Sequence, residues 1–137
     1  MIYEYVISGT PVAWTSHRGF GKKSFNPHYK EKEAARWELK NQHGQRPLFD
    51  RAVRVDFLFQ MPIPASWSKK KRTFSDFRAH PWKKAYHDKR PDATNLRKHA
   101  EDCLVGPVLS DDNIVVTGLT EKYYSSEPKT IIKIEEI

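Results

Sequence analysis

The feature that most constrains this chain is the segment between residues 89 and 104, in which polar residues lead into an amphipathic helix. Pro91 fixes its own φ angle and disfavours helical backbone in the residue before it, so the chain arrives extended. Asp92, Thr94 and Asn95 follow, and all three are residue types that cap helix N-termini through a side-chain oxygen. The sequence therefore predicts a helix that begins directly after Pro91.

The predicted helix has one apolar face. Four apolar residues recur at positions i, i+4, i+7 and i+8, which lie on one side of a helix: Leu96, Ala100, Cys103 and Leu104. Gly106 and Pro107 end the helix. Cys103 is the only cysteine, so no internal disulfide can form. Its place on the apolar face favours a buried small hydrophobe over a nucleophile.

Charged residues suited to phosphodiester chemistry flank this helix. Asp92 and Lys98 lie near its N-terminal end, and a hairpin-like return of the chain would bring Asp111 and Asp112 against them. Carboxylates hold Mg²⁺, the metal activates water, and a lysine adds positive charge, which together make a metal-dependent nuclease. A plainer interpretation is that Asp92 only caps the helix and that the Asp-Asp pair only forms a turn. Spacing alone favours this plainer interpretation.

The order of these residues resembles the RusA family of Holliday-junction resolvases. Residues 90–98 read R-P-D-A-T-N-L-R-K, and Asp111-Asp112 follow ahead of a predicted strand. Members of that family typically read K-x-D-x-D-N-L-x-K with a later D-D pair. Weaker agreement in residues 8–12, 25–27 and 61–71 extends the resemblance over nearly the whole chain.

The resemblance implies a RusA-like fold and an endodeoxyribonuclease that cleaves four-way DNA junctions in recombination and repair. It implies a homodimer, Mg²⁺ or Mn²⁺ as cofactor, and a gene often carried by phages and prophages. Carried over residue by residue, it assigns the catalytic roles to Asp92, Lys98 and Asp112. The metal would be held by Asp92, Asp111 and Asp112.

Thr94 departs from the family pattern, which has a second aspartate at this position. A threonine hydroxyl brings no negative charge, so both metal affinity and turnover are in question. Asp102, further along the same helix, is a candidate replacement for the missing carboxylate. The alternative function is therefore a catalytically weakened protein of the same fold that binds branched DNA without cutting it.

The chain carries a formal net charge of +7, which favours a polyanionic partner. Residues 66–90 are its most basic part, with aromatic residues interleaved, as suits phosphate contact and base stacking. The alternatives are a surface helix whose aromatics face the core, and a small accessory protein that binds nucleic acid non-specifically. We expect DNA contacts from Lys22, Lys23, Lys69, Lys70, Lys71, Arg72, Lys89 and Arg90.

The remaining pattern predicts a single α+β domain over residues 1–137, with helices packed on a mixed β-sheet. Strands are expected over 2–8 with a continuation at 12–14, over 52–60, over 115–124 and over 130–136, the last two joined by a hairpin at 125–128; further helices are expected over 27–42 and from 66 to about 77.

No apolar run approaches the ~18 residues that a membrane span requires. The N-terminus also lacks the basic and small-residue pattern of a signal peptide. We therefore expect a cytoplasmic protein with no membrane partner.

Overall fold

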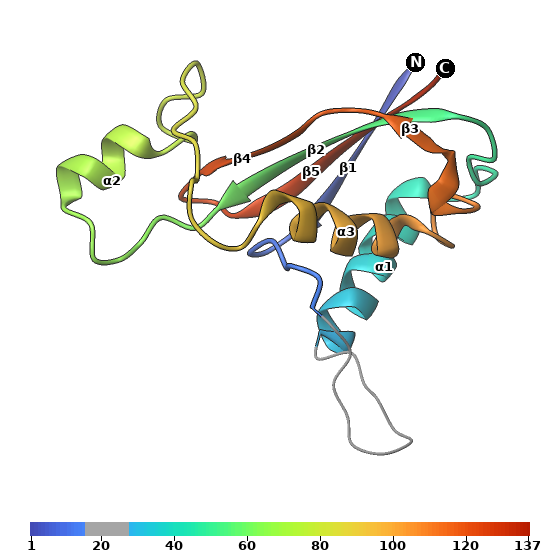
Figure 1. The fold of residues 1–137 in the computed structure, drawn as a ribbon, viewed down its shortest axis with the longest axis horizontal. Helices are drawn as coiled ribbons and strands as arrows, with labels where there is room; N and C mark the ends of the chain where they lie inside the picture. The colour runs from blue at the N-terminus through green and yellow to red at the C-terminus, as the bar shows by residue number, and fades with distance from the viewer. Residues whose placement is uncertain (16–27) are drawn as a thin grey trace.

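The alternating residues in the middle of the chain form the central strand of a five-stranded mixed sheet (Figure 1). The computed structural model describes residues 1–15 and 28–137. Its elements are β1 (Ile2–Ser8), α1 (Tyr29–His43), β2 (Val53–Met61), α2 (Lys69–Ser75), α3 (Ala93–Leu104), the 3-10 helix η1 (Asp112–Ile114), β3 (Val115–Thr117), β4 (Thr120–Tyr124) and β5 (Lys129–Glu136). The expected α+β fold with helices on a mixed sheet is confirmed.

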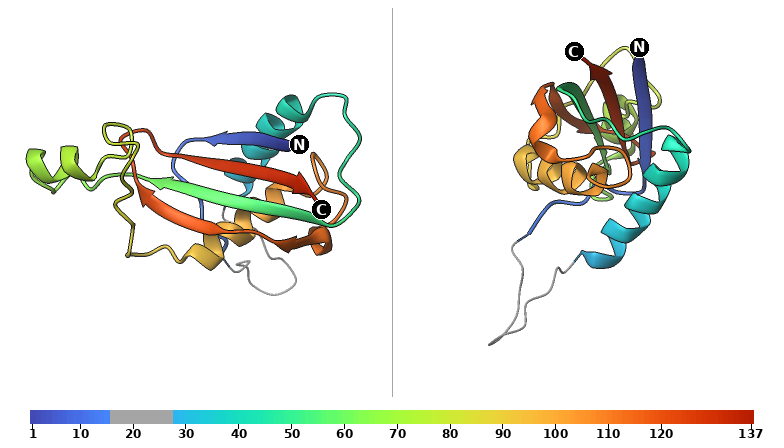
Figure 2. Two further views of the ribbon diagram at one scale, coloured as in Figure 1. Left: turned by 90° about the horizontal axis from the view of Figure 1, so that it is seen from above. Right: turned by 90° about the vertical axis from the view of Figure 1, so that its right-hand side faces the viewer.

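The sheet is ordered β1-β5-β2, with β3 and β4 both on the outer side of β2. β5 runs antiparallel to β1 and to β2, whereas β3 and β4 run parallel to β2 (Figure 2). The predicted hairpin at 125–128 is therefore wrong, because β2 lies between β4 and β5. The connection passes over the end of β2 instead of turning back beside β4.

The predicted strand over 115–124 is interrupted at Gly118 and Leu119. The side chain of Asp56 on β2 accepts a hydrogen bond from the Leu119 backbone N–H at 2.9 Å. Gly118 adopts a positive φ of 140°, and a Cβ atom there would lie 1.8 Å from the carbonyl oxygen of Val55. This close approach requires a glycine and divides the strand into β3 and β4.

The other predicted continuation, a strand at 12–14, is wrong. This segment forms no strand but crosses to α3, where the backbone N–H of Trp14 donates to the carbonyl of Asn95 at 2.8 Å.

The α1 and α3 helices cover one face of the sheet and contact each other (Figure 2). The predicted apolar stripe of α3 is confirmed, since its four residues are at most 2% exposed: Leu96, Ala100, Cys103 and Leu104. They meet a β2 face whose alternate residues are also buried: Val53, Val55, Phe57 and Phe59. Burial raises the pKa of the Cys103 thiol to about 12, which fits a small hydrophobe and not a nucleophile.

Residues 66–90 leave the end of the sheet, form α2 beyond it and run back to it, and we call them the arm (Figure 1). The predicted helix start is confirmed at Ser68, whose hydroxyl accepts from the Lys71 backbone N–H. The arm returns along the outer edge of β4, where the carbonyl of Ala85 accepts from Tyr124 at 2.9 Å. Within the described residues, no helix is long and apolar enough to cross a membrane.

Replacing Gly118 by alanine is expected to lower the free energy of unfolding by roughly 2–5 kcal/mol, because the new methyl meets backbone and the positive φ becomes strained. The control is Gly9→Ala, at a φ of 87° with nothing within 4 Å of the added methyl. That change should cost only roughly 1–2 kcal/mol. Urea denaturation of both variants measures the difference, and equal losses would contradict the close approach to Val55.

Candidate functional site

The N-terminal end of α3 presents Asp92 to solvent. Asp92 is the residue before the helix, and its carbonyl accepts from the N–H groups of Asn95 and Leu96 at 3.1 Å each. Its carboxylate makes no capping hydrogen bond, so the interpretation of Asp92 as only a cap finds no support in its contacts. The carboxylate remains available for a ligand.

Lys122 on β4 fixes the chain as it approaches Asp92. Its ammonium group donates to the carbonyls of Lys89 and Pro91, the latter at 2.7 Å. Sequence reasoning did not identify Lys122, because nothing in its own segment links it to residues 89–91. The contact ties the candidate site to the sheet.

Lys98, one helical turn beyond Thr94, lies over an aromatic ring. Its Nζ atom is 3.5 Å from the centroid of the Trp14 ring, a cation–π geometry. The backbone hydrogen bond from Trp14 to Asn95 holds that ring against the first turn of α3. Trp14 was missed as part of the site because its segment was predicted to be a strand. An aromatic residue just after the Gly9–Pro11 turn was the only signal.

Asp111 and Asp112 follow the C-terminal end of α3. The carbonyl of Leu104 accepts from Val108 and Leu109 at 3.0 Å each, which closes a tight turn just before them. The Asp111 carboxylate accepts from the Asn113 N–H at 3.4 Å. A hydrogen bond between the two aspartate side chains lowers the pKa of Asp111 and raises that of Asp112. Both side chains are exposed, so solvent and a cation can reach them.

The two parts of the predicted site lie at opposite ends of α3 (Figure 1). The helix has 12 residues. At 1.5 Å per residue it is about 18 Å long. Glu101 and Asp102, in its last turn, also raise the pKa of Asp112, so that residue lies beside the C-terminal end. In the part of the chain that the structure describes, no three acidic, histidine or cysteine side chains come together to hold a metal.

Asp102 does not take the place of a carboxylate at Thr94 within one chain. The two residues are eight positions apart on α3, about two helical turns. Asp102 lies instead with the Asp111-Asp112 pair.

The basic residues predicted to contact DNA fall in two groups. Lys22 and Lys23 lie outside the described residues. The others are exposed, on α2 or on the approach to Asp92: Lys69, Lys70, Lys71, Arg72, Lys89 and Arg90. Lys89 and Arg90 directly precede Pro91 and Asp92, whereas the other four lie on α2.

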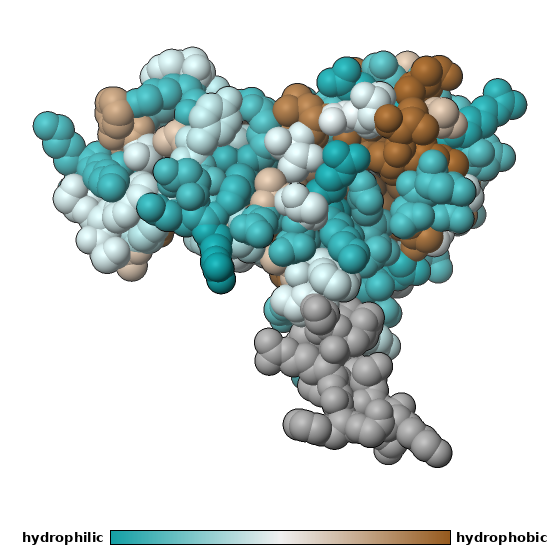
Figure 3. All heavy atoms as spheres, in the orientation of Figure 1, coloured by the Kyte–Doolittle hydropathy of each residue, from teal (hydrophilic) through white to brown (hydrophobic). Residues whose placement is uncertain are grey.

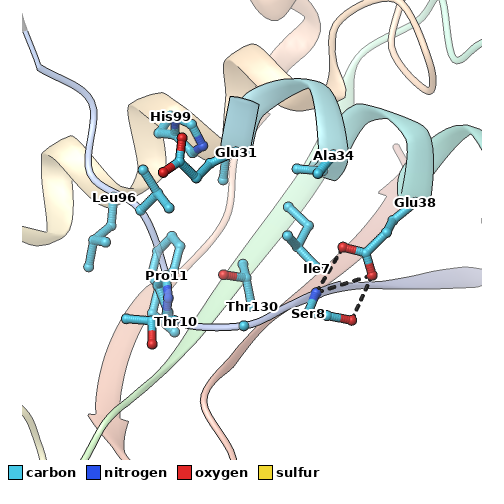
Figure 4. Close-up of a pocket in the computed structure, with 15 residues that line it drawn as sticks. Ile7, Ser8, Thr10, Pro11, Glu31, Ala34, Glu38, Leu96, His99 and Thr130 are labelled. Atoms are coloured by element: carbon cyan, nitrogen blue, oxygen red, sulfur yellow. Dashed lines mark hydrogen bonds between the residues drawn. The ribbon is translucent and has the colours of Figure 1, made fainter. Parts of the chain in front are cut away.

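A cavity of about 240 Å³ lies between residues 7–12, α1 and α3 (Figure 4). The carboxylate of Glu38 in its wall is already engaged, because it accepts from the Ser8 hydroxyl at 2.6 Å and from the Ser8 N–H. His99 lines the α3 side. Burial, with the nearby His28, lowers the pKa of His99, so the imidazole is neutral at pH 7. Glu31 of α1 also lines the cavity, close to His99 (Figure 4).

The sequence profile of a family described as Endodeoxyribonuclease RusA matches residues 11–135. The chain belongs to the RusA family. Its relatives include the uncharacterized protein YqaN of Bacillus subtilis (strain 168), 28% identical over 142 residues and matched over 98% of this chain and 96% of its own.

Membership in the RusA family implies an endodeoxyribonuclease with Holliday-junction resolvase activity on branched DNA. The family is generally dependent on a divalent metal. Asp92, Lys98, Asp111 and Asp112 all lie inside the matched region. Carboxylate oxygens are suitable donors for such a metal, so the residues at the two ends of α3 fit its chemistry.

The contact between Lys98 and Trp14 should appear as a coupling free energy. In a double-mutant cycle of Trp14→Leu and Lys98→Met, the destabilisations should deviate from additivity by about 0.5–1 kcal/mol, the usual strength of a partly exposed cation–π pair. Urea denaturation of the four proteins measures it. Strict additivity would mean that the ring does not hold the ammonium group.

Stability should fall on acidification because of His99. A histidine whose pKa is lowered in the folded state contributes stability above pH 6.5 that is lost as the pH falls through its folded value. Thermal unfolding at pH 7.5 and 5.5 should therefore show a larger decrease in Tm for the wild type than for His99→Gln. An equal decrease would show that His99 is not the group responsible.

Proposed function

We propose that this chain is a homodimeric Mg²⁺- or Mn²⁺-dependent endodeoxyribonuclease that cleaves four-way DNA junctions in recombination and repair. We infer further that each catalytic site is built from two copies. The observation that carries this proposal is the placement of Asp92 and Asp112 at opposite ends of one helix of about 18 Å. One chain cannot place both carboxylates on one cation.

A two-fold axis beside α3 resolves this difficulty. If the α3 helices of two copies run antiparallel across the axis, the N-terminal end of each lies beside the C-terminal end of the other. Asp92 of one copy then meets Asp111 and Asp112 of the second, and the symmetry generates two such sites. Two sites match the two strands that must be cut in a four-way junction.

An exposed apolar patch beside Asp112 supports association on this side of the molecule. Apolar side chains gather over β3 and the nearby chain ends (Figure 3), including Val116 and Leu119, which are 57% and 41% exposed. β3 is also the outermost strand there, whereas the outer edge of β4 is covered by residues 85–87. Exposed apolar surface at an uncovered strand edge is typical of an interaction site.

Each residue has a distinct role in the proposed site. Asp92, Asp111 and Asp112 would hold the metal, which when bound activates water and neutralises charge on the phosphate. Lys98 adds a positive charge to the phosphate, and the Trp14 ring keeps its ammonium group beside the first turn of α3. Lys122 holds the backbone from which Asp92 projects.

Thr94 favours a second candidate, a branched-DNA-binding protein with weakened catalysis. Its exposed hydroxyl stands where the family pattern has an aspartate, so the site has one carboxylate fewer. If this candidate holds, the wild type binds junctions without metal-dependent cleavage, and Thr94→Asp gains cleavage. If the protein is a nuclease, the wild type cuts with Mg²⁺ or Mn²⁺, and Thr94→Asp cuts at a lower metal concentration than the wild type requires.

Mixed dimers test whether the site is shared between copies. Asp92→Asn and Asp112→Asn are expected to be inactive as homodimers. Co-expressed with different tags and purified as a heterodimer, the two variants should regain one intact site and nick one strand of a labelled four-way junction. The regained activity should be about half that of a wild-type dimer, since one of two sites is restored.

The heterodimer separates the two arrangements of the site. Sites within single chains would leave the mixed dimer as inactive as its parents, because each site would carry one substitution. If either homodimer cut as well as the wild type, the residue assignment itself would be wrong. A heterodimer of wild type and Asp92→Asn serves as the control for one intact site.

A further inference from the structure

The arm is fixed to the sheet by aromatic residues that point inward at its base. The Trp67 and Tyr124 rings lie 4.8 Å apart, and those of Phe77 and Tyr123 lie 4.6 Å apart. The Asp76 carboxylate also accepts from the backbone N–H of Ser126 at 2.8 Å. The arm is therefore an ordered projection that can hold its outer surface in a defined position.

Other aromatic residues of the arm face solvent. Phe74 is 63% exposed and Trp82 is 79% exposed. The imidazole of His80 lies between them, with its centroid 6.4 Å from that of Phe74 and 5.2 Å from that of Trp82. These three neighbouring rings do not belong to the hydrophobic core. Their exposure on a projection indicates a surface on which another ring could stack.

A shallow groove of about 560 Å³ lies beside these rings. It is lined by Lys69, Lys70, Thr73, Phe74 and His80. The Nζ atom of Lys83 lies 3.0 Å from the Phe74 ring centroid, so an ammonium group also covers part of that ring. The groove thus combines an aromatic wall with cationic side chains around it.

The positive charge of the chain is concentrated in this arm. Residues 66–90 contain nine Lys and Arg against two Asp, a net +7 that equals the net charge of the whole chain. The remaining residues balance, with 15 basic and 15 acidic side chains. Of the arm's cations, within the described chain, only Arg78 and Lys84 lie within 4 Å of a carboxylate. The arm is therefore suited to a polyanion.

We propose that this groove binds an unpaired nucleobase at the branch point of DNA, with Phe74 stacked on the base and Lys69 and Lys70 on the flanking phosphates. An aromatic wall with cations around it matches a flat ring attached to phosphate. Bases inside a duplex are covered by their neighbours, so the groove accepts only unpaired or unstacked bases. This inference rests on the proposed function and adds a means of selecting branched over linear DNA.

A second copy of the chain is a poorer occupant. Two arms of +7 would have to approach each other, and their repulsion opposes such a contact. An apolar segment of another protein would leave Lys69 and Lys70 without anionic partners. The charge of the groove therefore favours a nucleotide.

The test measures binding without cleavage, in EDTA, so that it does not depend on catalysis. The probes are a single-stranded oligonucleotide and a four-way junction, each carrying 2-aminopurine, and a linear duplex with the same label. Wild-type protein should change the fluorescence of the unpaired probe. Phe74→Leu should bind the single strand about 5- to 100-fold more weakly, the range for loss of one stacking contact, with duplex affinity nearly unchanged.

Two controls isolate the ring from the charge. Tyr29→Leu removes an aromatic residue that is also 63% exposed, but on α1, and should leave single-strand binding unchanged. Lys70→Gln should weaken binding to all three probes alike and reduce the salt dependence. Equal losses for Phe74→Leu on single strand and duplex, or none on either, would overturn the base-binding groove.

The outcome also separates this inference from the proposed function. If the wild type cleaves junctions and Phe74→Leu binds as the wild type does, only the proposal of a base-binding groove is rejected. If Phe74→Leu loses single-strand binding selectively but the wild type shows no metal-dependent cleavage, the base-binding groove is supported and the nuclease function is rejected.

Discussion

The packing of one amphipathic helix against the central strand determines where the candidate acidic residues lie. The buried stripe of α3, from Leu96 to Leu104, faces the apolar side of β2. Burying a large apolar side chain stabilises a fold by roughly 1.5–3 kcal/mol, so this interface fixes the direction and rotation of α3 firmly. Asp92 and the Asp111-Asp112 pair are attached to the two ends of a helix that cannot turn or slide. Their separation is consequently a property of the core and not of a mobile loop.

A fixed separation within one chain makes association the simplest way to build a site. Acidic residues lie near both ends of α3, and the apolar patch around Val116 lies beside one of them. A two-fold arrangement with antiparallel α3 helices uses both features together. Dependence on a second copy would also link cutting to the presence of two sites, which an enzyme acting on two strands requires.

Much of this fold could be predicted from local pattern. The limits and apolar stripe of α3, the buried face of β2 and the Ser68 cap all follow from spacing and side-chain chemistry. The placement of β4 could not be predicted, because strand pairing is decided by long-range packing and Val115–Tyr124 carries no signal for parallel pairing with β2. The requirement for glycine at position 118 arises only from the nearby backbone of Val55, which the sequence does not place. The roles of Trp14 and Lys122 likewise depend on contacts between distant segments.

The arrangement of the candidate site residues could not be predicted, and their roles remain a prediction. A hairpin-like return after α3 was expected to bring Asp112 to Asp92, yet the chain turns tightly after Leu104 and Asp112 stays beside that end. The length of the predicted helix already implied this separation. The aromatic residues of the arm were equally hard to place, because they recur with no regular period. Contacts with Tyr123 and Tyr124, which the sequence does not reveal, decide which of them point inward.

Anomalous diffraction from crystals soaked in Mn²⁺ tests the shared site most directly. The account predicts a manganese peak bound by Asp92 of one copy and by Asp111 or Asp112 of a second copy. A peak coordinated by carboxylates of a single chain, with Asp92 of every copy remote from metal, would contradict it.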